Sequence, residues 1–332
     1  MTAATALTVR MLSGFDDLDA ATWARLLAAG DTDAVFLTRP YLAAWWGAFG
    51  RGGLLLLLAE EDGTPVALAP LFTDGGMAFF VGSGGSDYLD VLGDADTEVL
   101  VALLDAARQS VPGFVGFRFY HVPDASRTGA RLQAAAARLG LVRFDEGHLP
   151  APALALRDAG VAREAANKKS LRRHENALRR EGRLAVTHLT DGAAIRPHLP
   201  AFFAQHEARW ADTPWPSLFH DPAQRRFYER LTETAGDAGW LRFTRVTWDD
   251  RPVAFHFGFC LGGRYLWYKP SFDVALARRS PGEVLLRHLL LAAAEEDART
   301  FDFGLGDEPF KRRFATHVPT VRTWGLYPPE VL

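Results

Sequence analysis

A long internal repeat constrains this chain more than any other sequence feature. The stretch EEDGTPVALAPLF, around Pro65, aligns with TWDDRPVAFHFGF, around Pro252, at an offset of 187 residues. EVLVALLDAAR and EVLLRHLLLAA align through Glu98 and Glu283 at an offset of 185 residues, and GFRFY and TFDFG keep nearly the same spacing. One long and steady offset predicts two copies of a single α+β unit rather than a short solenoid repeat.

Each copy alternates strands with helices. Hairpins are expected over 54–72 and 241–260, with turns at Asp62-Gly63 and Asp249-Asp250. The helices expected lie at 18–29, 38–49, 96–110, 126–139, 161–182, 191–210, 222–236 and 281–298. Prolines near residue 150 separate an N-terminal module, 1–150, from a C-terminal module, 151–332. The expected fold class is α+β, or three-layer α/β, with mixed, mostly antiparallel sheets flanked by helices.

Composition and motifs exclude several function classes. The chain has 332 residues, 48% hydrophobic and 23% charged, which is typical of a soluble globular protein. No apolar run reaches the roughly 20 residues of a membrane span, and the start lacks the layout of a secretion signal. Cys260 is the single cysteine, so no intrachain disulfide can form. We therefore expect a cytoplasmic protein. No P-loop, no G-x-S-x-G elbow and no His/Cys cluster with metal spacing occurs, so we expect no metal.

The two halves carry opposite charge. Residues 1–150 hold ten arginines, no lysine and 18 acidic residues, whereas residues 151–332 hold 27 basic and 22 acidic residues. An anionic ligand should therefore prefer the second half. The excess of five positive charges is too small to indicate a DNA-binding protein.

The stretch ARRSPGE is the first candidate binding site. Ser280 suits a helix N-cap, Pro281 the first turn, and Glu283 would complete a capping box. Arg278 and Arg279 precede this cap, and free N–H groups beside arginines form an anion site. The alternative is an ordinary capped helix with two solvated arginines, which Glu283 favours because its carboxylate would repel an anion.

The stretch FDFGLGDEPFKRRF is the second candidate. Asp302 lies on the strand face opposite its phenylalanine neighbours, and Gly304 and Gly306 allow a substrate to approach the backbone closely. Lys311 falls one turn into the following helix. An ordinary strand-turn-helix explains these residues equally, and the lone G-x-G supports no dinucleotide fingerprint.

Three further features have both a functional and a structural interpretation. The basic stretch 167–183, with Lys168 and Arg172, is a cationic wall for phosphates or RNA, or a solvated helix face. The residues Asp87, Tyr88 and Asp90 follow a glycine-rich turn; they could recognise an amine or a hydroxyl, or belong to the turn. His256, within a strand, is a general base or a structural histidine.

The ordered motifs S-P-G, F-D-F-G-x-G-D-E and F-K-x-R-F, with NKKSLRRHENALRREG and DYLD before them, resemble the acyltransferases typified by the CelD/BcsL cellulose-biosynthesis proteins. These belong to the GNAT superfamily and are distantly related to Fem-type peptidyltransferases. The resemblance spans roughly 35–325 and is strongest in 251–314. It implies two GNAT-like modules and an acyl-CoA co-substrate, with acetyl-CoA as the leading candidate. The sequence RRSPGE stands where the family usually has Arg/Gln-x-x-Gly-x-Gly/Ala.

The resemblance also implies where the donor and acceptor lie. The pyrophosphate of the donor would lie at the helix start formed by Ser280, Pro281 and Gly282. Lys311 matches the lysine of the Fem-type F-K motif, which lies near the acyl donor. Asp87 or Asp90 is the counterpart of an aspartate that contacts the acceptor. The complete expected set assigns His256, Tyr268, Asp302 and Lys311 to catalysis, Arg278, Arg279, Ser280, Pro281, Gly282 and Lys269 to the donor, and Asp87, Tyr88, Asp90, Lys168, Arg172 and Trp267 to the substrate.

The main hypothesis is a transfer of an acyl group from a CoA or carrier-protein thioester to an amine or hydroxyl of a small molecule or sugar. No nucleophile motif is visible, so attack would be direct, and backbone N–H groups of the strand YLWYKP would polarise the thioester carbonyl. His256 or Asp302 would accept the acceptor's proton, and Tyr268 or Lys311 would protonate or steady the departing thiolate.

Two rival hypotheses remain open. The basic stretch favours a Fem-like transferase that uses aminoacyl-tRNA. A non-catalytic binding module of a polysaccharide-synthesis complex is the other, because tryptophans stack on sugars. The tryptophans available for this are Trp45, Trp46, Trp210, Trp215 and Trp267.

Overall fold

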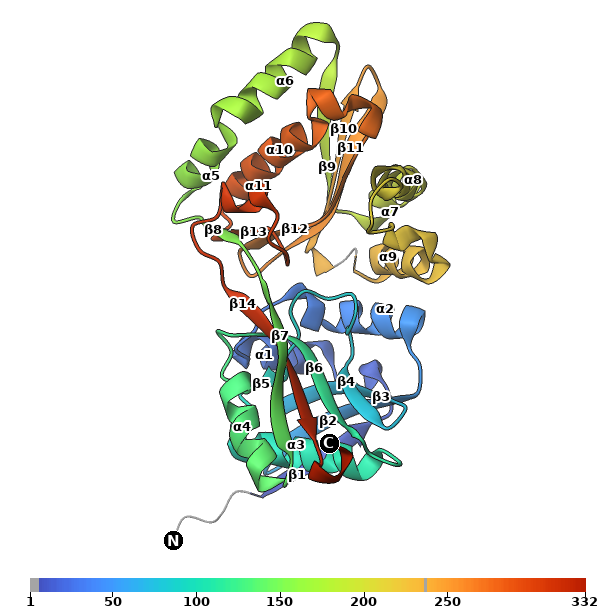
Figure 1. Cartoon of the computed structure of the whole chain (residues 1–332), viewed down its shortest axis with the longest axis vertical. Coiled ribbons are helices and arrows are strands. Elements are labelled where there is room, and N and C mark those ends of the chain that lie inside the picture. Colours follow the sequence, from blue (N-terminus) through green and yellow to red (C-terminus); the bar gives the residue numbers. More distant parts are fainter. Residues whose placement is uncertain (1–5, 236–237) are drawn as a thin grey trace. The chain divides into compact units, whose positions relative to one another are not determined.

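The chain folds into two compact units in a computed structural model that describes residues 6–235 and 238–332. The first unit runs to Pro150 and also includes Pro319–Leu332, and the second is Ala151–Val318. The C-terminal segment 319–332, which the sequence analysis assigned to the second module, thus belongs to the sheet of the first. Each unit has its own mixed sheet flanked by helices, and the predicted α+β fold class is confirmed (Figure 1).

The first unit is built on an eight-stranded sheet. Its strand order is β1-β2-β3-β4-β6-β14-β7, with β5 paired to β3, and among the strands of the described residues only β4 and β6 pair in parallel. Its elements are β1 (Leu7–Leu12), η1 (Phe15–Asp17), α1 (Ala20–Ala29), η2 (Val35–Leu37), α2 (Arg39–Phe49), β2 (Gly53–Glu61), β3 (Thr64–Asp74), β4 (Met77–Phe80), β5 (Leu92–Gly93), α3 (Thr97–Ser110), β6 (Gly116–Pro123), α4 (Thr128–Arg138), β7 (Val142–Pro150), β14 (Thr320–Tyr327) and η7 (Pro329–Val331).

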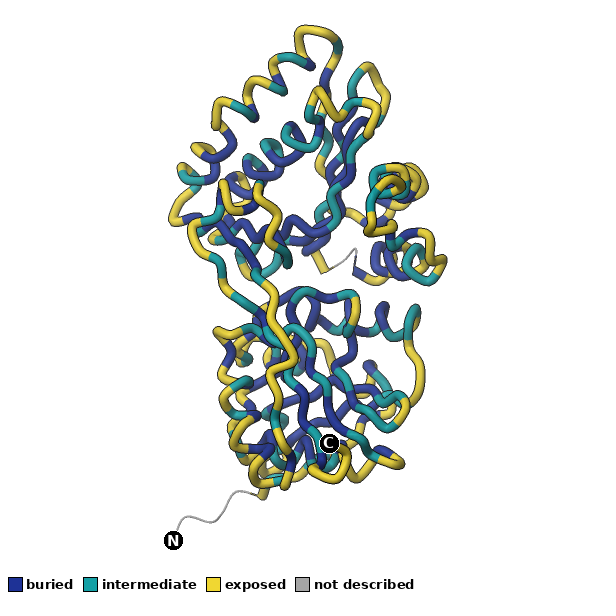
Figure 2. The backbone as a smooth tube through the Cα atoms, in the orientation of Figure 1, coloured by how far each residue is buried: buried dark blue, intermediate teal, exposed yellow. Residues whose placement is uncertain are grey.

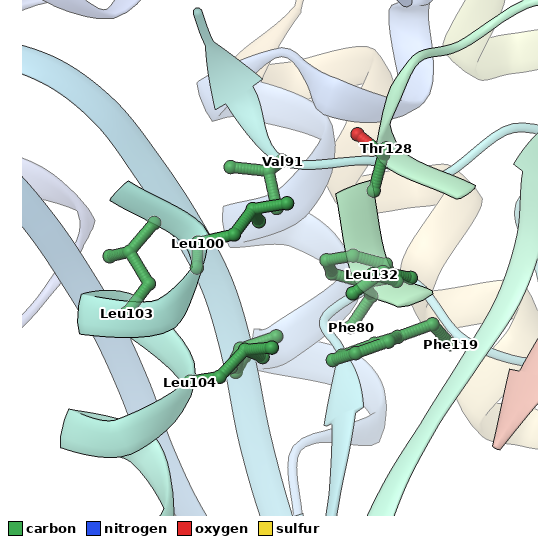
Figure 3. Close-up of a pocket in the computed structure, with 10 residues that line it drawn as sticks. Phe80, Val91, Leu100, Leu103, Leu104, Phe119, Thr128 and Leu132 are labelled. Atoms are coloured by element: carbon green, nitrogen blue, oxygen red, sulfur yellow. The ribbon is translucent and has the colours of Figure 1, made fainter. Parts of the chain in front are cut away.

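The core of the first unit lies on both faces of this sheet. Helices α3 and α4 cover the face that carries Leu71, Phe80 and Phe119, whereas α2 packs on the opposite face, where Trp45 contacts Phe72 with ring centroids 5.5 Å apart. A cavity of about 10 Å³ remains under α3 and α4, lined by apolar side chains and Thr128 (Figure 3). A space this small and apolar is a packing defect rather than a ligand site.

The second unit is built on a six-stranded sheet. Its strand order is β8-β13-β12-β11-β10-β9, and only β12 and β13 pair in parallel. Its elements are β8 (Ala153–Ala155), α5 (Ala159–Ala166), α6 (Lys169–Glu181), β9 (Leu184–Leu189), α7 (Gly192–Ile195), η3 (Arg196–His198), α8 (Leu199–Trp210), η4 (Leu218–His220), α9 (Pro222–Thr234), β10 (Leu241–Trp248), β11 (Arg251–Leu261), β12 (Arg264–Phe272), η6 (Val274–Arg279), α10 (Pro281–Glu295), β13 (Thr300–Asp302) and α11 (Pro309–Arg312).

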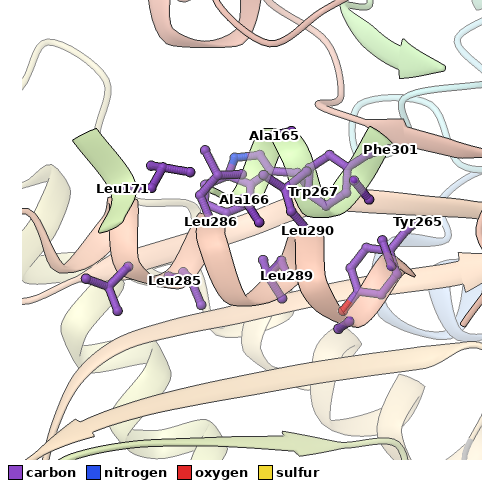
Figure 4. Packing of buried hydrophobic residues seen from close by; sticks show 14 of the residues in the cluster. Ala165, Ala166, Leu171, Tyr265, Trp267, Leu285, Leu286, Leu289, Leu290 and Phe301 are labelled. Atoms are coloured by element: carbon purple, nitrogen blue, oxygen red, sulfur yellow. The ribbon is translucent and has the colours of Figure 1, made fainter. Parts of the chain in front are cut away.

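Two layers of helices bury the second sheet. Helices α5, α6 and α10 enclose an apolar cluster that includes Trp267, Leu286 and Leu290 (Figure 4). Helices α8 and α9 cover the other face, where Phe202 and Tyr228 contact Phe257. The buried residues accordingly run along the sheet and the inner faces of these helices (Figure 2).

The predicted hairpins and most predicted helices are confirmed. Both hairpin turns use left-handed backbone, with φ of 48° at Asp62 and 77° at Gly63, and 47° and 63° at the two aspartates 249 and 250. Two successive left-handed residues are the geometry of the tight turn that matches the twist of antiparallel strands, and Asp and Gly tolerate it best.

Two predicted helices are divided. The helix expected over 161–182 breaks into α5 and α6, because Lys168 is extended, with a ψ of 137°. The helix expected over 191–210 becomes α7, η3 and α8, because Pro197 and Pro200 lack the N–H that a continuous helix needs and start new turns instead. The last residue of the helix expected over 222–236 lies outside the described residues.

Candidate functional site

Strands β12 and β13 separate soon after they pair. Their parallel register covers Arg264 with Thr300, Tyr265 with Phe301, and Leu266 with Asp302. Strand β13 then ends, while β12 continues to Phe272. Among the described residues, no strand pairs with this side of β12 beyond Leu266. A strand edge that no further strand covers is where an extended ligand can add to a sheet.

The first turn of α10 follows this strand edge. Ser280 is left-handed, with φ 53° and ψ 53°, and its side chain makes no capping hydrogen bond. The predicted capping box is therefore wrong: Ser280 accepts the Glu283 N–H through its backbone carbonyl, at 3.0 Å, and not through its side chain. Left-handed backbone at a non-glycine residue costs about 1 kcal/mol or more, and such strain often occurs at functional positions.

The Glu283 carboxylate, in the first turn of α10, has two partners. Arg313 donates from Nη2 to its carboxylate at 2.9 Å, and Nε2 of His174 lies 3.4 Å from the other oxygen. The carboxylate that seemed to oppose anion binding is thus paired with a neighbouring cation. The first turn of α10 keeps its partial positive charge.

The basic residues predicted for this region divide into paired and exposed groups. Arg279 pairs with Glu181, and its guanidinium lies 5.1 Å from the Trp248 ring centroid. Lys168 donates to the backbone carbonyl of Arg313 at 2.7 Å. Arg278 at the end of η6 and Arg172 on α6 are exposed. Through these contacts the start of α6 lies next to the end of α11, and the end of α6 lies next to η6.

The loop after β13 encloses two of the predicted catalytic residues. Asp302 is 0% exposed, accepts from Arg264 Nη1 at 2.8 Å and accepts the Gly304 N–H at 2.8 Å. Lys311 is 4% exposed and donates from Nζ to the Leu305 carbonyl at 2.7 Å.

The Lys311 ammonium also pairs with Glu308 at 2.8 Å. Gly306, with a φ of 114°, lets the loop pass close to this pair, because a Cβ there would lie 2.6 Å from the Glu308 carboxylate. The loop thus fixes a buried ammonium beside the end of β13.

Three predicted residues occupy the middle of the second sheet. His256 is fully buried, and its Nε2 lies 3.2 Å from the carbonyl oxygen of Leu266 and 3.3 Å from the backbone nitrogen of Tyr268. The Tyr268 ring packs 5.1 Å from Phe259, and Lys269 Nζ lies 4.2 Å above that tyrosine ring. Burial lowers the pKa of His256 to about 3, so the imidazole is neutral.

In the first unit, the predicted acceptor residues lie mostly in the interior. Asp90 is 1% exposed and accepts from Thr32 Oγ1 at 2.7 Å and from the Val91 N–H at 2.8 Å. Burial raises the pKa of Asp90 above its usual range. Tyr88 is buried against Phe36, and Asp87 is half-buried. The Asp90 carboxylate therefore forms hydrogen bonds within the first unit, to Thr32 and Val91.

The tryptophans considered for sugar stacking differ in their exposure. Trp45 and Trp267 are buried, and Trp46 and Trp210 are half-buried. Trp215 is 72% exposed. The interior positions are explained by core packing.

Several residues around the site were not identified from the sequence. Glu175 on α6 is bonded by Arg179 one helical turn away and by Arg287 and His288 of α10. The His288 hydrogen bond and the neighbouring arginines lower the pKa of Glu175 to about 2. The spacing from Glu175 to Arg179 was a usable signal for an ion pair. The partners on α10 are more than one hundred residues away in sequence, and no local pattern indicates them.

Neither a membrane-crossing helix nor a metal cluster occurs in the described part of the chain. None of the helices there is long and apolar enough to span a bilayer. No group of three His, Cys, Asp or Glu side chains in residues 6–235 and 238–332 is arranged to hold a metal ion.

Comparison with known proteins places this geometry in context. Residues 165–312 match the family model described as an acetyltransferase (GNAT) domain. The crystal structure of FemX is similar over 93% of this chain and 96% of that chain, with a TM-score of 0.66 and 10% identity. A tandem GNAT protein from the clavulanic acid biosynthesis pathway is similar over 97% and 99%, with a TM-score of 0.54 and 14% identity.

The L-PGS of Bacillus licheniformis is similar over 87% of this chain and 90% of that chain, with a TM-score of 0.53 and 15% identity. No curated protein matches the chain significantly. Structural likeness at such low identity establishes the fold alone, whereas the family model matches the sequence of the second unit, including α10, β12 and the loop after β13. Residues 165–312 of the second unit are similar in sequence to an acetyltransferase (GNAT) domain, and the fold around them is shared with FemX and with the tandem GNAT protein.

Proposed function

We propose that the chain is an acyltransferase that moves an acyl group from acyl-CoA to an amine or hydroxyl of a small-molecule or sugar acceptor. Acetyl-CoA is the leading candidate for the donor. The observation that carries this proposal is the uncapped first turn of α10 beside the unpaired edge of β12. The ordered S-P-G, F-D-F-G-x-G-D-E and F-K-x-R-F motifs support a further assignment to the CelD/BcsL-like acyltransferases.

The residues at the start of α10 fit the phosphates of such a donor. The Ser280 side chain makes no capping hydrogen bond; its backbone carbonyl accepts the Glu283 N–H at 3.0 Å, and Gly282 adds no side chain over its own N–H. Arg278 is exposed beside this turn, and the charge of Glu283 is offset by Arg313. These features together support phosphate binding, because N–H groups and the helix dipole both favour an anion there.

Backbone groups and two side chains would serve the transfer itself. N–H groups on the free edge of β12 would polarise the thioester carbonyl, and the Lys311 ammonium would offset the charge of the departing thiolate. Tyr268 would donate its phenolic proton to the same sulfur, and the proton that the attacking amine or hydroxyl loses would pass to solvent and return from there to Tyr268. Asp302, held by Arg264, would keep the loop after β13 in place rather than accept a proton.

Isothermal titration with acetyl-CoA and with CoA tests the donor assignment. We expect the wild-type chain to bind both, and Arg278→Ala with Arg279→Ala to weaken both affinities. Arg180→Ala is the matched control, because it removes an exposed arginine at the end of α6. Absence of binding to the wild-type chain, or equal weakening by the control, would refute the donor site.

A Fem-like transferase using aminoacyl-tRNA is the second candidate. The exposed basic residues of α6 and the fold shared with FemX favour it. Tight binding of tRNA that weakens steeply with salt, together with no affinity for CoA, would replace the first proposal by this one.

A further inference from the structure

Strand β12 contains an irregular step opposite a single glycine. Its partner strand β11 pairs Phe257 with Lys269 and Phe259 with Leu266. Between these pairs Gly258 alone faces two residues of β12. This two-against-one arrangement is a β-bulge, which shifts the alternation of side chains by one residue.

The shift changes the direction of Lys269. Regular alternation would put it on the same face as Trp267, in the apolar cluster under α10. Because Lys269 lies opposite Phe257, which packs on Phe202 of α8, it shares the α8 face instead. Its ammonium accordingly lies over the ring of its neighbour Tyr268.

His256 fills the space that this bulge creates. Its Nε2 lies between the Leu266 carbonyl and the Tyr268 backbone nitrogen, at 3.2 Å and 3.3 Å. A Cβ on Gly258 would lie 2.2 Å from His256 Cε1 and 2.5 Å from the Leu266 oxygen. The imidazole therefore depends on glycine at 258 and contacts both strand groups that the bulge displaces.

The imidazole is poorly placed to exchange protons with an acceptor. It has no exposed surface, and its ring stacks on Trp267 at a centroid distance of 5.7 Å. Within the described residues, Nδ1 has no hydrogen-bond partner. Nε2 accepts the Tyr268 N–H at 3.3 Å and lies 3.2 Å from the Leu266 carbonyl oxygen, so the same ring atom contacts a donor and an acceptor of β12.

We infer that His256 is a positioning residue: together with Gly258 it holds the bulge that turns Lys269 to the α8 face. Its relevance to catalysis rests on the proposed function, in which Tyr268, one of the two bulge residues opposite Gly258, protonates the departing thiolate. The role as a general base is thereby replaced by one that acts through β12.

Two variants separate this role from simple packing. His256→Leu removes both polar contacts, and His256→Gln retains a group that both donates and accepts. Val246→Ala is the matched control, because it truncates a buried side chain of neighbouring β10 without touching the bulge. Amine labelling of Lys269, followed by mass spectrometry, reports the direction of its side chain, and titration with acetyl-CoA reports the donor site.

We expect labelling of Lys269 to be lost and donor affinity to fall about tenfold in His256→Leu, with both retained in His256→Gln and Val246→Ala. Unchanged labelling in a folded His256→Leu would overturn the inference.

The wild-type chain supplies a second test. Nitrogen NMR should show the His256 imidazole neutral from about pH 5 to about pH 8, and titration of the imidazole in that range would equally overturn the inference. A wild-type chain that binds no acetyl-CoA would refute the proposed function, while Lys269 labelling would still decide the role of His256.

Discussion

Helices α3 and α10 occupy equivalent places in the two units but begin differently. Each connects two strands that pair in parallel over three residue pairs, β4 with β6 and β12 with β13. Asp96 caps α3 by accepting the Val99 N–H at 2.9 Å, and Glu98 adds a second acid to that first turn. Helix α10 has no side-chain cap. Of these two helices, α10 alone begins without a side-chain cap, and its Glu283 N–H is bonded to the Ser280 backbone carbonyl instead.

The space beside the parallel strands also differs. In the first unit the chain itself fills it: the Leu89 N–H donates to the His121 carbonyl at 3.1 Å, and His121 Nδ1 lies 2.7 Å from the Ser86 carbonyl. In the second unit β12 keeps an unpaired edge within the described residues. The comparison teaches that the fold alone does not make a donor site, because the same architecture is closed in one copy by its own loop and cap.

Truncating the core of the first unit should have the largest effect on stability. Phe80 is 1% exposed and lines the small cavity under α3 and α4. Phe80→Ala should destabilise that unit by about 3–5 kcal/mol, because it removes a buried ring and enlarges the cavity. Hydrogen exchange of the β4 and β6 amides measures this loss. If the first unit plays no part in donor binding, the affinity of the folded variant for acetyl-CoA stays at the wild-type value.

Removing the buried ammonium of the second unit should have the next largest effect, on turnover. Lys311→Met should lower kcat about 100-fold, because the departing thiolate loses its positive partner. Arg312→Met is the control, since it removes a neighbouring cation that pairs with exposed Asp307. Equal activities of the two variants in a thiol-release assay would separate Lys311 from the chemistry.

Opening the first unit's helix should have a smaller effect and create no second site. Asp96→Ala removes the cap of α3 and should cost about 1 kcal/mol of stability. The stoichiometry of acetyl-CoA binding by titration should stay at one per chain, because residues 86–89 still fill the space beside β6. Two binding events per chain would break the distinction between the copies.

Acidification should distinguish the units most subtly. The pKa of Glu175 is lowered to about 2, so its ionised form stabilises the second unit above the ordinary value of 4.5 and this contribution is lost as the pH falls toward 2. The raised pKa of Asp90 has the opposite sign, favouring the first unit at low pH. Hydrogen exchange of α6 and α10 should accelerate in acid, and Glu175→Gln should remove that dependence. Faster exchange confined to α3 and α4 would contradict this assignment.

Much of the fold follows from local sequence patterns. The hairpin turns at Asp62-Gly63 and Asp249-Asp250, the apolar periodicity of α3 and α10, and the offset between Glu98 and Glu283 each depend on residues near one another in the chain. Turn geometry and helix periodicity are local physical properties, so the sequence by itself determined the alternation of elements and the presence of two related units.

Tertiary structure decided which side chains are accessible and how distant segments pair. Strand β14 lies between β6 and β7, whose residues come about 170 to 210 positions earlier, and no local pattern specifies such a partner. The burial of Asp302 and His256, and the pairing of Glu283 with Arg313, depend on neighbours from other elements. Accessibility and charge pairing arise only when the whole chain packs, because desolvation and partner geometry are properties of the assembled structure.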